Sequence, residues 1–340
     1  MVAWMPEGAT LISVPSATLN LRMAIVIILL PLLPAAFPAV SEDSGPAEAN
    51  MPSTAEAGQY ALWRGNYRLA EEIWTCALNS GDVQSRARAA TCLGGLLYRH
   101  GQPARAARIL ERAVRLSVKA FGADSRPTAD ALIALADAYR EQEQLDRAEE
   151  LYRKAVKTRL AVSGEKSYDT LEALDRLGDL CYKRQRYGEA EAIFSRCLKA
   201  RESTSGVDEL DLAGSMNSLA VAISRQGRCR SAEGLLRHAI ASAERVLGPR
   251  HFLVASMIGN LAGICNDQNK FSEAELLYLK SMEINQSALG DSKTTARSAE
   301  RLGAFYLQQG RYLSAMTAFL EGSRIGLICK ISRRPYPPGF

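Results

Sequence analysis

The sequence predicts an all-α protein, built from about seven helix-turn-helix repeats that stack side by side. Three observations lead to this fold class. Ala, Leu, Arg and Glu are plentiful, and these residues cost little in a helix, whereas aromatic residues make up only 7% of the chain. Only three prolines, Pro103, Pro127 and Pro249, lie between residues 53 and 334. Phrases similar to "RAEELYRKA", which begins at Arg147, recur at intervals of 42 residues, as expected for a repeat protein.

The first 41 residues differ from the rest of the chain. Residues 23–39 are apolar and uncharged, and a stretch rich in Pro, Ser and Ala follows them. This pattern predicts a signal peptide cleaved after Ala39 or Ser41, and therefore an exported protein, periplasmic or secreted. An uncleaved membrane anchor through residues 23–39 is one alternative, although the segment is short for a span. An unstructured apolar leader is another. Residues 42–53 form a linker.

Small residues mark the middle of the first helix of each predicted pair: Gly58, Gly94, Ala136, Gly178, Ala220, Ala262 and Gly303. An alanine follows each of them after twelve residues: Ala70, Ala106, Ala148, Ala190, Ala232, Ala274 and Ala315. A large residue follows after sixteen: Trp74, Leu110, Tyr152, Phe194, Leu236, Tyr278 and Phe319. The constant spacing between these three sets predicts seven pairs of helices.

Each pair is expected to form a helical hairpin. In "LADAYREQEQLDRAEELYRKAV" the apolar residues recur at helical spacing, and a short polar break separates the two helices. A short break turns the second helix back against the first, and small residues let the two backbones approach closely. We expect the large residue, for example Tyr152 or Phe194, to fill the gap to the neighbouring pair. Stacked pairs would supply the core over residues 54–328 and leave residues 329–340 as a tail.

This pattern resembles the tetratricopeptide repeat (TPR) family. "LGDLCYKRQRYGEAEAIFSRCLKA" from Leu177 and "LGAFYLQQGRYLSAMTAFLEG" from Leu302 match its signature well. The 42-residue period, with "MNSLA" from Met216 and "GNLA" from Gly259, is similar to the kinesin-light-chain type. The resemblance covers residues 54–325. It implies a right-handed α-α superhelix (TPR solenoid) and a non-enzymatic scaffold that binds a peptide or protein segment in its concave groove.

Both ends of the repeat array depart from the pattern. The first repeat is short, and its first helix is weak. The last helix runs into "IGLICKISRRPYPPGF", which is apolar and then rich in proline, whereas solenoids usually end in a polar cap. A frayed tail, a docking site and an altered terminus are the three interpretations of this end.

No motif in the sequence indicates catalysis. The three histidines, His100, His238 and His251, have no His or Cys at metal-ligand spacing, and the nucleotide-binding and hydrolase fingerprints are absent. We therefore expect no enzyme activity, no cofactor and no metal. A net charge of +5 without long Lys/Arg blocks argues against a nucleic-acid partner. Seven cysteines without a CxxC motif are expected to be free, buried thiols rather than a disulfide framework.

The first helix of each pair is expected to line the concave groove, so its polar side chains are the candidates for binding. These are Arg88, Thr91, Tyr98, Asp130, Asp137, Arg140, Asp175, Asp179, Tyr182, Asn217, Arg225 and Asn266. The resemblance implies that Asn217 holds a peptide backbone, because an amide both donates and accepts hydrogen bonds. Acidic residues in repeats three and four favour a basic or amphipathic segment; an ordinary solvated polar face is the alternative. The alternative function is a membrane-anchored assembly factor of an envelope complex.

Overall fold

The computed structural model describes residues 54–204 and 206–332, so the predicted leader and linker lie outside the described residues. The described residues form fourteen helices and no strand. In chain order they are α2 (Thr54–Trp63), α3 (Tyr67–Ser80), α4 (Val83–Arg99), α5 (Pro103–Phe121), α6 (Arg126–Glu141), α7 (Leu145–Ser163), α8 (Tyr168–Lys183), α9 (Tyr187–Glu202), α10 (Glu209–Ser224), α11 (Cys229–Leu247), α12 (Phe252–Asp267), α13 (Phe271–Leu289), α14 (Lys293–Gln308) and α15 (Tyr312–Ser332).

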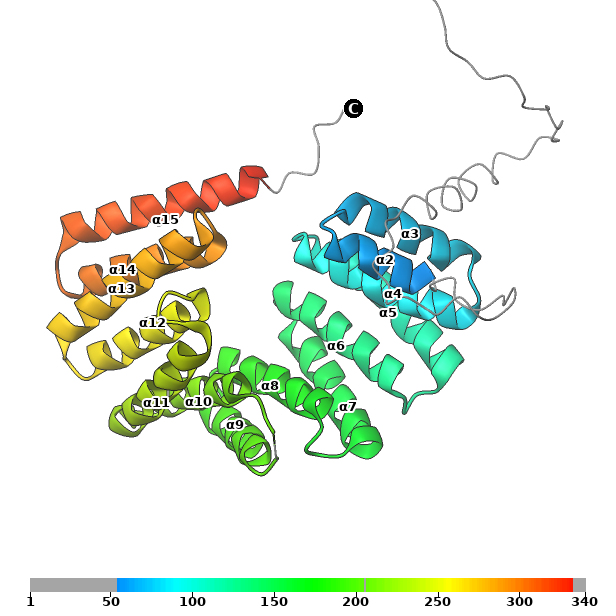
Figure 1. Ribbon diagram of the computed structural model, residues 1–340, viewed down its shortest axis with the longest axis horizontal. Coiled ribbons are helices and arrows are strands. Elements are labelled where there is room, and N and C mark those ends of the chain that lie inside the picture. The colour runs from blue at the N-terminus through cyan, green and yellow to red at the C-terminus, as the bar shows by residue number, and fades with distance from the viewer. Residues whose placement is uncertain (1–53, 205, 333–340) are drawn as a thin grey trace, which may run out of the picture.

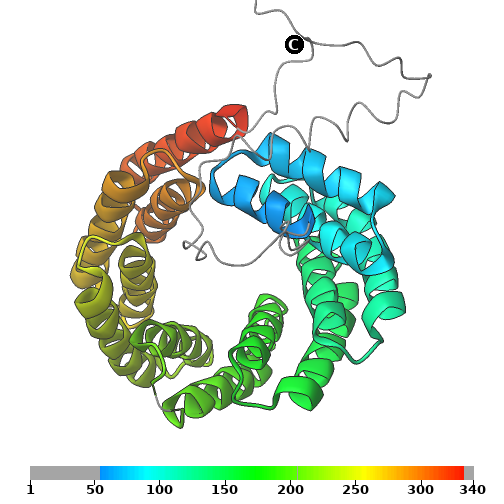
Figure 2. The same cartoon turned by 45° about the vertical axis from the view of Figure 1, so that its right-hand side comes forward.

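Consecutive helices pack as seven antiparallel pairs, from α2 with α3 to α14 with α15, and the pairs stack into a right-handed superhelix. The first helix of each pair lies on the inside of the curve, and the second lies on the outside (Figure 2). Several first helices also touch the first helix of the next pair, for example α2 with α4 and α10 with α12. The superhelix curls far enough that α15 comes round toward α2 and α3 (Figures 1 and 2). The seven predicted pairs are therefore present.

The recurring small residues lie where the two helices of one pair cross. A Cβ atom added at Gly178 would come within 2.6 Å of the Phe194 ring, and one at Gly303 within 2.9 Å of Phe319. The large residue thus packs against the first helix of its own pair. It does so because sixteen residues of helix, turn and helix return the chain to the level of the small residue. Tyr278 also contacts the neighbouring pair, as the sequence predicts: its ring centre lies 5.5 Å from that of Phe305 in α14.

The turn inside each pair contains one residue with a positive φ. Glycine stands there in four pairs, but three pairs have a side chain at this position: Glu143 (φ 60°), Gln185 (φ 60°) and Asn269 (φ 61°). In all three turns the next residue donates its amide hydrogen to a carbonyl near the end of the first helix, as Arg186 does to Cys181 at 2.9 Å. This left-handed step reverses the chain between the two helices.

In four outer helices, α7, α9, α11 and α13, a glutamate just after the recurring alanine joins the helix to the next pair. It accepts hydrogen bonds from a cation that stands immediately before the next outer helix. We call this series of contacts the glutamate ladder; it comprises Glu149 with Arg186, Glu191 with Arg228, Glu233 with Lys270, and Glu275 with Arg311. The distances are 2.5 Å to Arg186, 2.7 Å to Lys270 and 2.8 Å to Arg311. The ladder adds ionic contacts to the apolar stacking of the pairs.

The two ends of the described chain are less regular. Helix α2 has only ten residues, in line with the weak first repeat. Helix α15 continues to Ser332, so residues 329–332, which we had assigned to the tail, are helical. Cys181, Cys197, Cys265 and Cys329 are free, buried thiols. Among the described helices, none combines the length and the apolar character that crossing a membrane requires.

Candidate functional site on the inner face

All twelve predicted binding residues belong to first helices or to the residue that ends one, namely α4, α6, α8, α10 and α12. The three candidates on α4 are the least available for binding a partner. Thr91 donates to the Ala87 carbonyl of its own helix at 3.1 Å. Arg88 lies 5.7 Å from the ring centre of Phe121, and Tyr98 packs partly into the core. Several candidates on α6 to α12 make polar contacts between pairs.

Asp137 is a structural anion rather than a free binding group. Its side chain is buried and accepts a 2.5 Å hydrogen bond from the Tyr152 hydroxyl. It also forms ion pairs with Arg140, at 3.2 Å, and with Arg176 from the next pair. Burial raises the pKa of Tyr152, and the Asp137 charge adds to this shift. Asp137 therefore ties three helices together, as expected of a buried, fully partnered charge.

Asp130 and Asp175 are also neutralised, by arginines that the sequence analysis did not single out. Arg159 and Arg201 come from outer helices, and their side chains are buried. Arg159 pairs with Asp130, and Arg201 pairs with Asp175 at 2.6 Å. These arginines are 42 residues apart, one repeat period, and that spacing is the signal that could have revealed them. The acids in repeats three and four thus provide less negative charge than their number suggests.

Asp179 is the exception among these acids. Its side chain is exposed and has no hydrogen-bond or ion-pair partner among the described residues. The surrounding inner helices displace much of the bulk water, and this burial raises its pKa to about 6. Negative charge on Asp175 and Asp137 acts in the same direction, whereas Arg140 and Arg176 oppose it. An exposed carboxylate in such a place is suited to accept a cation.

Hydrogen bonds that are not ion pairs join the inner helices further along the superhelix. Arg225 donates to the Tyr182 hydroxyl at 3.0 Å, and Asn260 donates to the Asn217 carbonyl oxygen at 2.9 Å. The Asn217 oxygen is therefore already used, which limits the backbone-holding role that the resemblance implies for this residue. Asn266 donates to Gln308 at 2.9 Å, but its own carbonyl oxygen is buried without a partner. Asn266 thus has a spare acceptor.

Two arginines of α14 bring unneutralised positive charge to the other end of the inner helices. Arg301 donates to the Gly259 carbonyl at 2.7 Å and lies 5.9 Å from the ring centre of Tyr278. Burial lowers its pKa, and Arg297 and Arg225 act in the same direction. Arg297 stands one helical turn before Arg301, is exposed, and forms no ion pair with any described residue. The sequence analysis missed both arginines, because it did not extend the candidates into α14.

One group of side chains has the composition of a metal site. The ligand atoms of Glu233, Cys265 and Glu273 lie within 4.8 Å of one another. Lys270 and Arg237 already bind this group: the lysine lies 2.7 Å from Glu233, and the arginine joins both carboxylates.

The same arrangement recurs two repeats earlier in the superhelix. There Arg153 joins Glu149 and Glu189, which lies near Cys181. The group around Glu233 is therefore part of the stacking of pairs, and its carboxylates are neutralised by cations rather than left open to a metal ion.

Comparison with known families gives one match over most of the chain. The family model of the tetratricopeptide repeat matches overlapping segments at residues 85–161, 143–203, 169–245, 211–287 and 253–325. None of the curated protein sequences that we compared matches the chain.

Solved structures share the fold at low sequence identity. The repeats of a Podosopora anserina protein assigned as a kinesin light chain align with a TM-score of 0.51 and 20% identity, over 59% of this chain and 96% of that one. BtubC (BKLC) from P. vanneervenii aligns with a TM-score of 0.51 and 22% identity, over 70% and 94%. A Rap protein complexed with Competence and Sporulation Factor aligns with a TM-score of 0.61 and 14% identity, over 84% and 79%.

Proposed function

Because the chain belongs to the tetratricopeptide repeat family, we propose that it is a non-enzymatic scaffold that holds an extended segment of a partner protein along its inner face. One observation carries this proposal: among the described inner helices, Asp179 near the middle and Arg297 at the C-terminal end are exposed charges of opposite sign that form no ion pair, whereas Asp130, Asp137 and Asp175 are neutralised. A Rap protein of similar fold has been solved in complex with Competence and Sporulation Factor, which supports a binding role for such a superhelix.

The positions of the unpaired groups define the chemistry of the segment. A Lys or Arg side chain of the partner would pair with Asp179, and a carboxylate would pair with Arg297 and Arg301. The segment would therefore be basic at one end and acidic at the other, and it would bind in one direction only. The acidic middle that the sequence suggested is thus largely neutralised.

A library of histidine-free peptides with a basic and an acidic end tests the proposal, using fluorescence anisotropy on the full chain. Peptides selected on the wild type are expected to bind at least about tenfold more weakly to Asp179→Asn and to Arg297→Gln, because each variant loses one charge pair. Glu150→Gln, on the exposed side of an outer helix, is the matched control and should leave affinity unchanged. Equal affinity in all three variants would show that the segment binds elsewhere.

The pH dependence of binding gives a second readout. Asp179 loses its charge as pH falls through about 6, so affinity for the basic end should decline over that range. In Asp179→Asn this part of the pH dependence should disappear, because the amide does not titrate. A wild-type pH profile that the substitution leaves unchanged would exclude Asp179 as the contact.

We also propose that the protein is exported by cleavage of a signal peptide within residues 1–41, and the proposal rests on the sequence pattern alone. N-terminal sequencing of the mature protein tests it. A start near Glu42 is expected. Recovery of residues 23–39 in the membrane fraction would instead favour the anchored assembly factor.

A further inference from the structure

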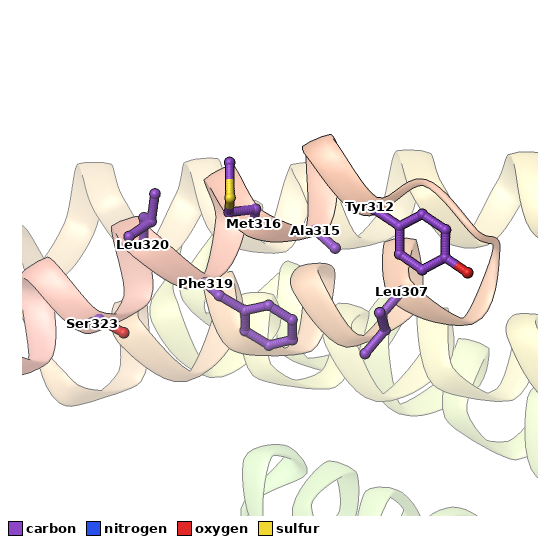
Figure 3. A pocket seen from close by; sticks show the side chains of 7 residues that line it. All are labelled: Leu307, Tyr312, Ala315, Met316, Phe319, Leu320 and Ser323. Carbon is purple, nitrogen blue, oxygen red and sulfur yellow. The ribbon is translucent and has the colours of Figure 1, made fainter.

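Helix α15 presents a regular apolar stripe to solvent. Leu313, Met316, Leu320 and Leu327 are 78%, 56%, 62% and 59% exposed. They follow one another at intervals of three, four and seven residues, and exposed Ser323 occupies the remaining heptad position. This is the a/d spacing of helices that pack nearly parallel or antiparallel to one another. Figure 3 shows Met316 and Leu320 projecting on the same side of α15.

The stripe lies where the glutamate ladder stops. Met316 directly follows Ala315, so it occupies the position that Glu149, Glu191, Glu233 and Glu275 have in earlier outer helices. In those helices the glutamate pairs with the cation of the next pair. The last pair thus continues the stacking surface of the superhelix but replaces its charge with an apolar side chain. An apolar helix is the complementary occupant.

A shallow depression accompanies the stripe. It has a volume of about 340 Å³ and lies between the end of α14 and the start of α15. Leu307 and Phe319 line its floor, and Met316 and Tyr312 stand at its edges (Figure 3). Its lining is almost entirely apolar. A single large side chain from an opposing helix fits such a volume.

We propose that the occupant is a second copy of this chain, and that two α15 helices pack antiparallel about a twofold axis. In this arrangement Met316 of each copy lies opposite Leu320 of the other, and each stripe covers the other. The charge distribution supports self-association: no charged residue lies in the stripe, and nearby Arg324 is already paired with Glu321 and Asp291 of its own chain.

The size of the surface sets the strength of this contact. One helix face provides less than the roughly 800 Å² per partner that a stable complex usually buries. The dimer is therefore weak, with a dissociation constant on the order of micromolar. Such a dimer forms and separates with concentration, and analytical ultracentrifugation resolves this behaviour.

Sedimentation velocity of the full chain between about 1 and 100 µM tests the proposal, a range that brackets a micromolar dissociation constant. The weight-average sedimentation coefficient of the wild type should rise from the monomer value to the dimer value. Met316→Glu, which restores the glutamate of the other repeats, should remain monomeric and weaken association at least about tenfold. Leu313→Arg should do the same. Leu276→Glu is the matched control: it is 69% exposed on α13, outside the stripe, and should dimerise like the wild type.

Three outcomes would overturn the proposal. The wild type could remain monomeric throughout the range. A dimer could persist in Met316→Glu and Leu313→Arg but dissociate in Leu276→Glu. Finally, removal of residues 333–340 could convert a monomer into a dimer, which would identify that segment as the cover of the stripe. Circular dichroism of each variant establishes that the helical content is unchanged.

Discussion

Glu233 illustrates how a single side chain stabilises the contact between two pairs. Its carboxylate is mostly buried and accepts hydrogen bonds from Lys270 and Gln268, both at 2.7 Å, and from Arg237 at 2.9 Å. The bond from Lys270 is the main cause that lowers the pKa of Glu233 to about 2, and those from Gln268 and Arg237 add to it. A carboxylate with such partners favours the folded state only while it is ionised.

Glu233→Gln is expected to destabilise the contact between α11 and α13 by about 1–2 kcal/mol at pH 7, because three charge-assisted hydrogen bonds are weakened. Hydrogen exchange of the amides in α11 to α13 measures this loss locally. The stabilising effect of wild-type Glu233 is present above pH 4.5 and is lost as pH falls toward 2. The difference between the proteins should therefore shrink over that interval, and a difference that grows on acidification would contradict the assignment.

In the helical hairpins, the residue type at the left-handed position of the turn varies from one pair to the next. Four of the seven turns use glycine at the left-handed position, but Gln185 has a φ of 60° and no side-chain hydrogen bond with the described residues. A side chain in this conformation is strained, because its Cβ approaches the backbone. The hairpin of α8 and α9 forms nevertheless, since the packing of Phe194 on Gly178 holds the two helices together.

Gln185→Gly should stabilise the protein by about 0.5–1 kcal/mol, the difference between relieved strain and the greater freedom of the unfolded chain. Thermal unfolding of the two proteins measures the effect. Lys154→Gly, at an exposed position inside α7, is the control and should lose about 1 kcal/mol. If both substitutions destabilise equally, the turn is not strained.

The helices could be predicted from the sequence, because the residue patterns that indicate them are local. Much of the candidate site could not be predicted in this way. A small and a large residue sixteen positions apart indicate one helical hairpin, and this sequence contains seven examples of that spacing. The partner of Asp137 depends on how successive pairs rotate about the superhelix axis, and that of Asp175 depends on how the two helices of one pair face each other. Arg176 reaches Asp137 across 39 residues, and Arg201 reaches Asp175 from an outer helix. Helical periodicity places acids on a face, but it does not reveal which of them are neutralised.

At the scale of the whole molecule, the apolar core is divided. One cluster includes Trp74 and Leu110 and extends to Ala138, and the other extends from Ala129 to Ala318, so the two overlap only near α6. A solenoid with such a core is stabilised mainly by contacts between neighbouring pairs. A destabilising substitution near one end should therefore affect the pairs beside it and leave distant pairs folded.

Trp74→Ala is expected to destabilise the first pairs by about 3–5 kcal/mol, because Trp74 is almost fully buried. Hydrogen exchange should accelerate in α2 to α5 and remain near the wild-type rate in α10 to α15. Phe194→Ala, which removes a comparable residue from the middle, should instead affect α8 and α9 and the pairs beside them. Uniform acceleration along the chain in both variants would indicate a single cooperative unit.

The curl of the superhelix has a mechanical consequence. The last pair comes round toward the first, while extensive packing joins only consecutive pairs. The molecule therefore resembles a split ring whose elasticity is distributed over six similar joints, so that a small rotation at each joint adds up to a large change in the opening. An extended segment would enter from the rim without such a change. A bulkier ligand would have to spread the ring, and its affinity would be reduced by the elastic energy that this spreading requires.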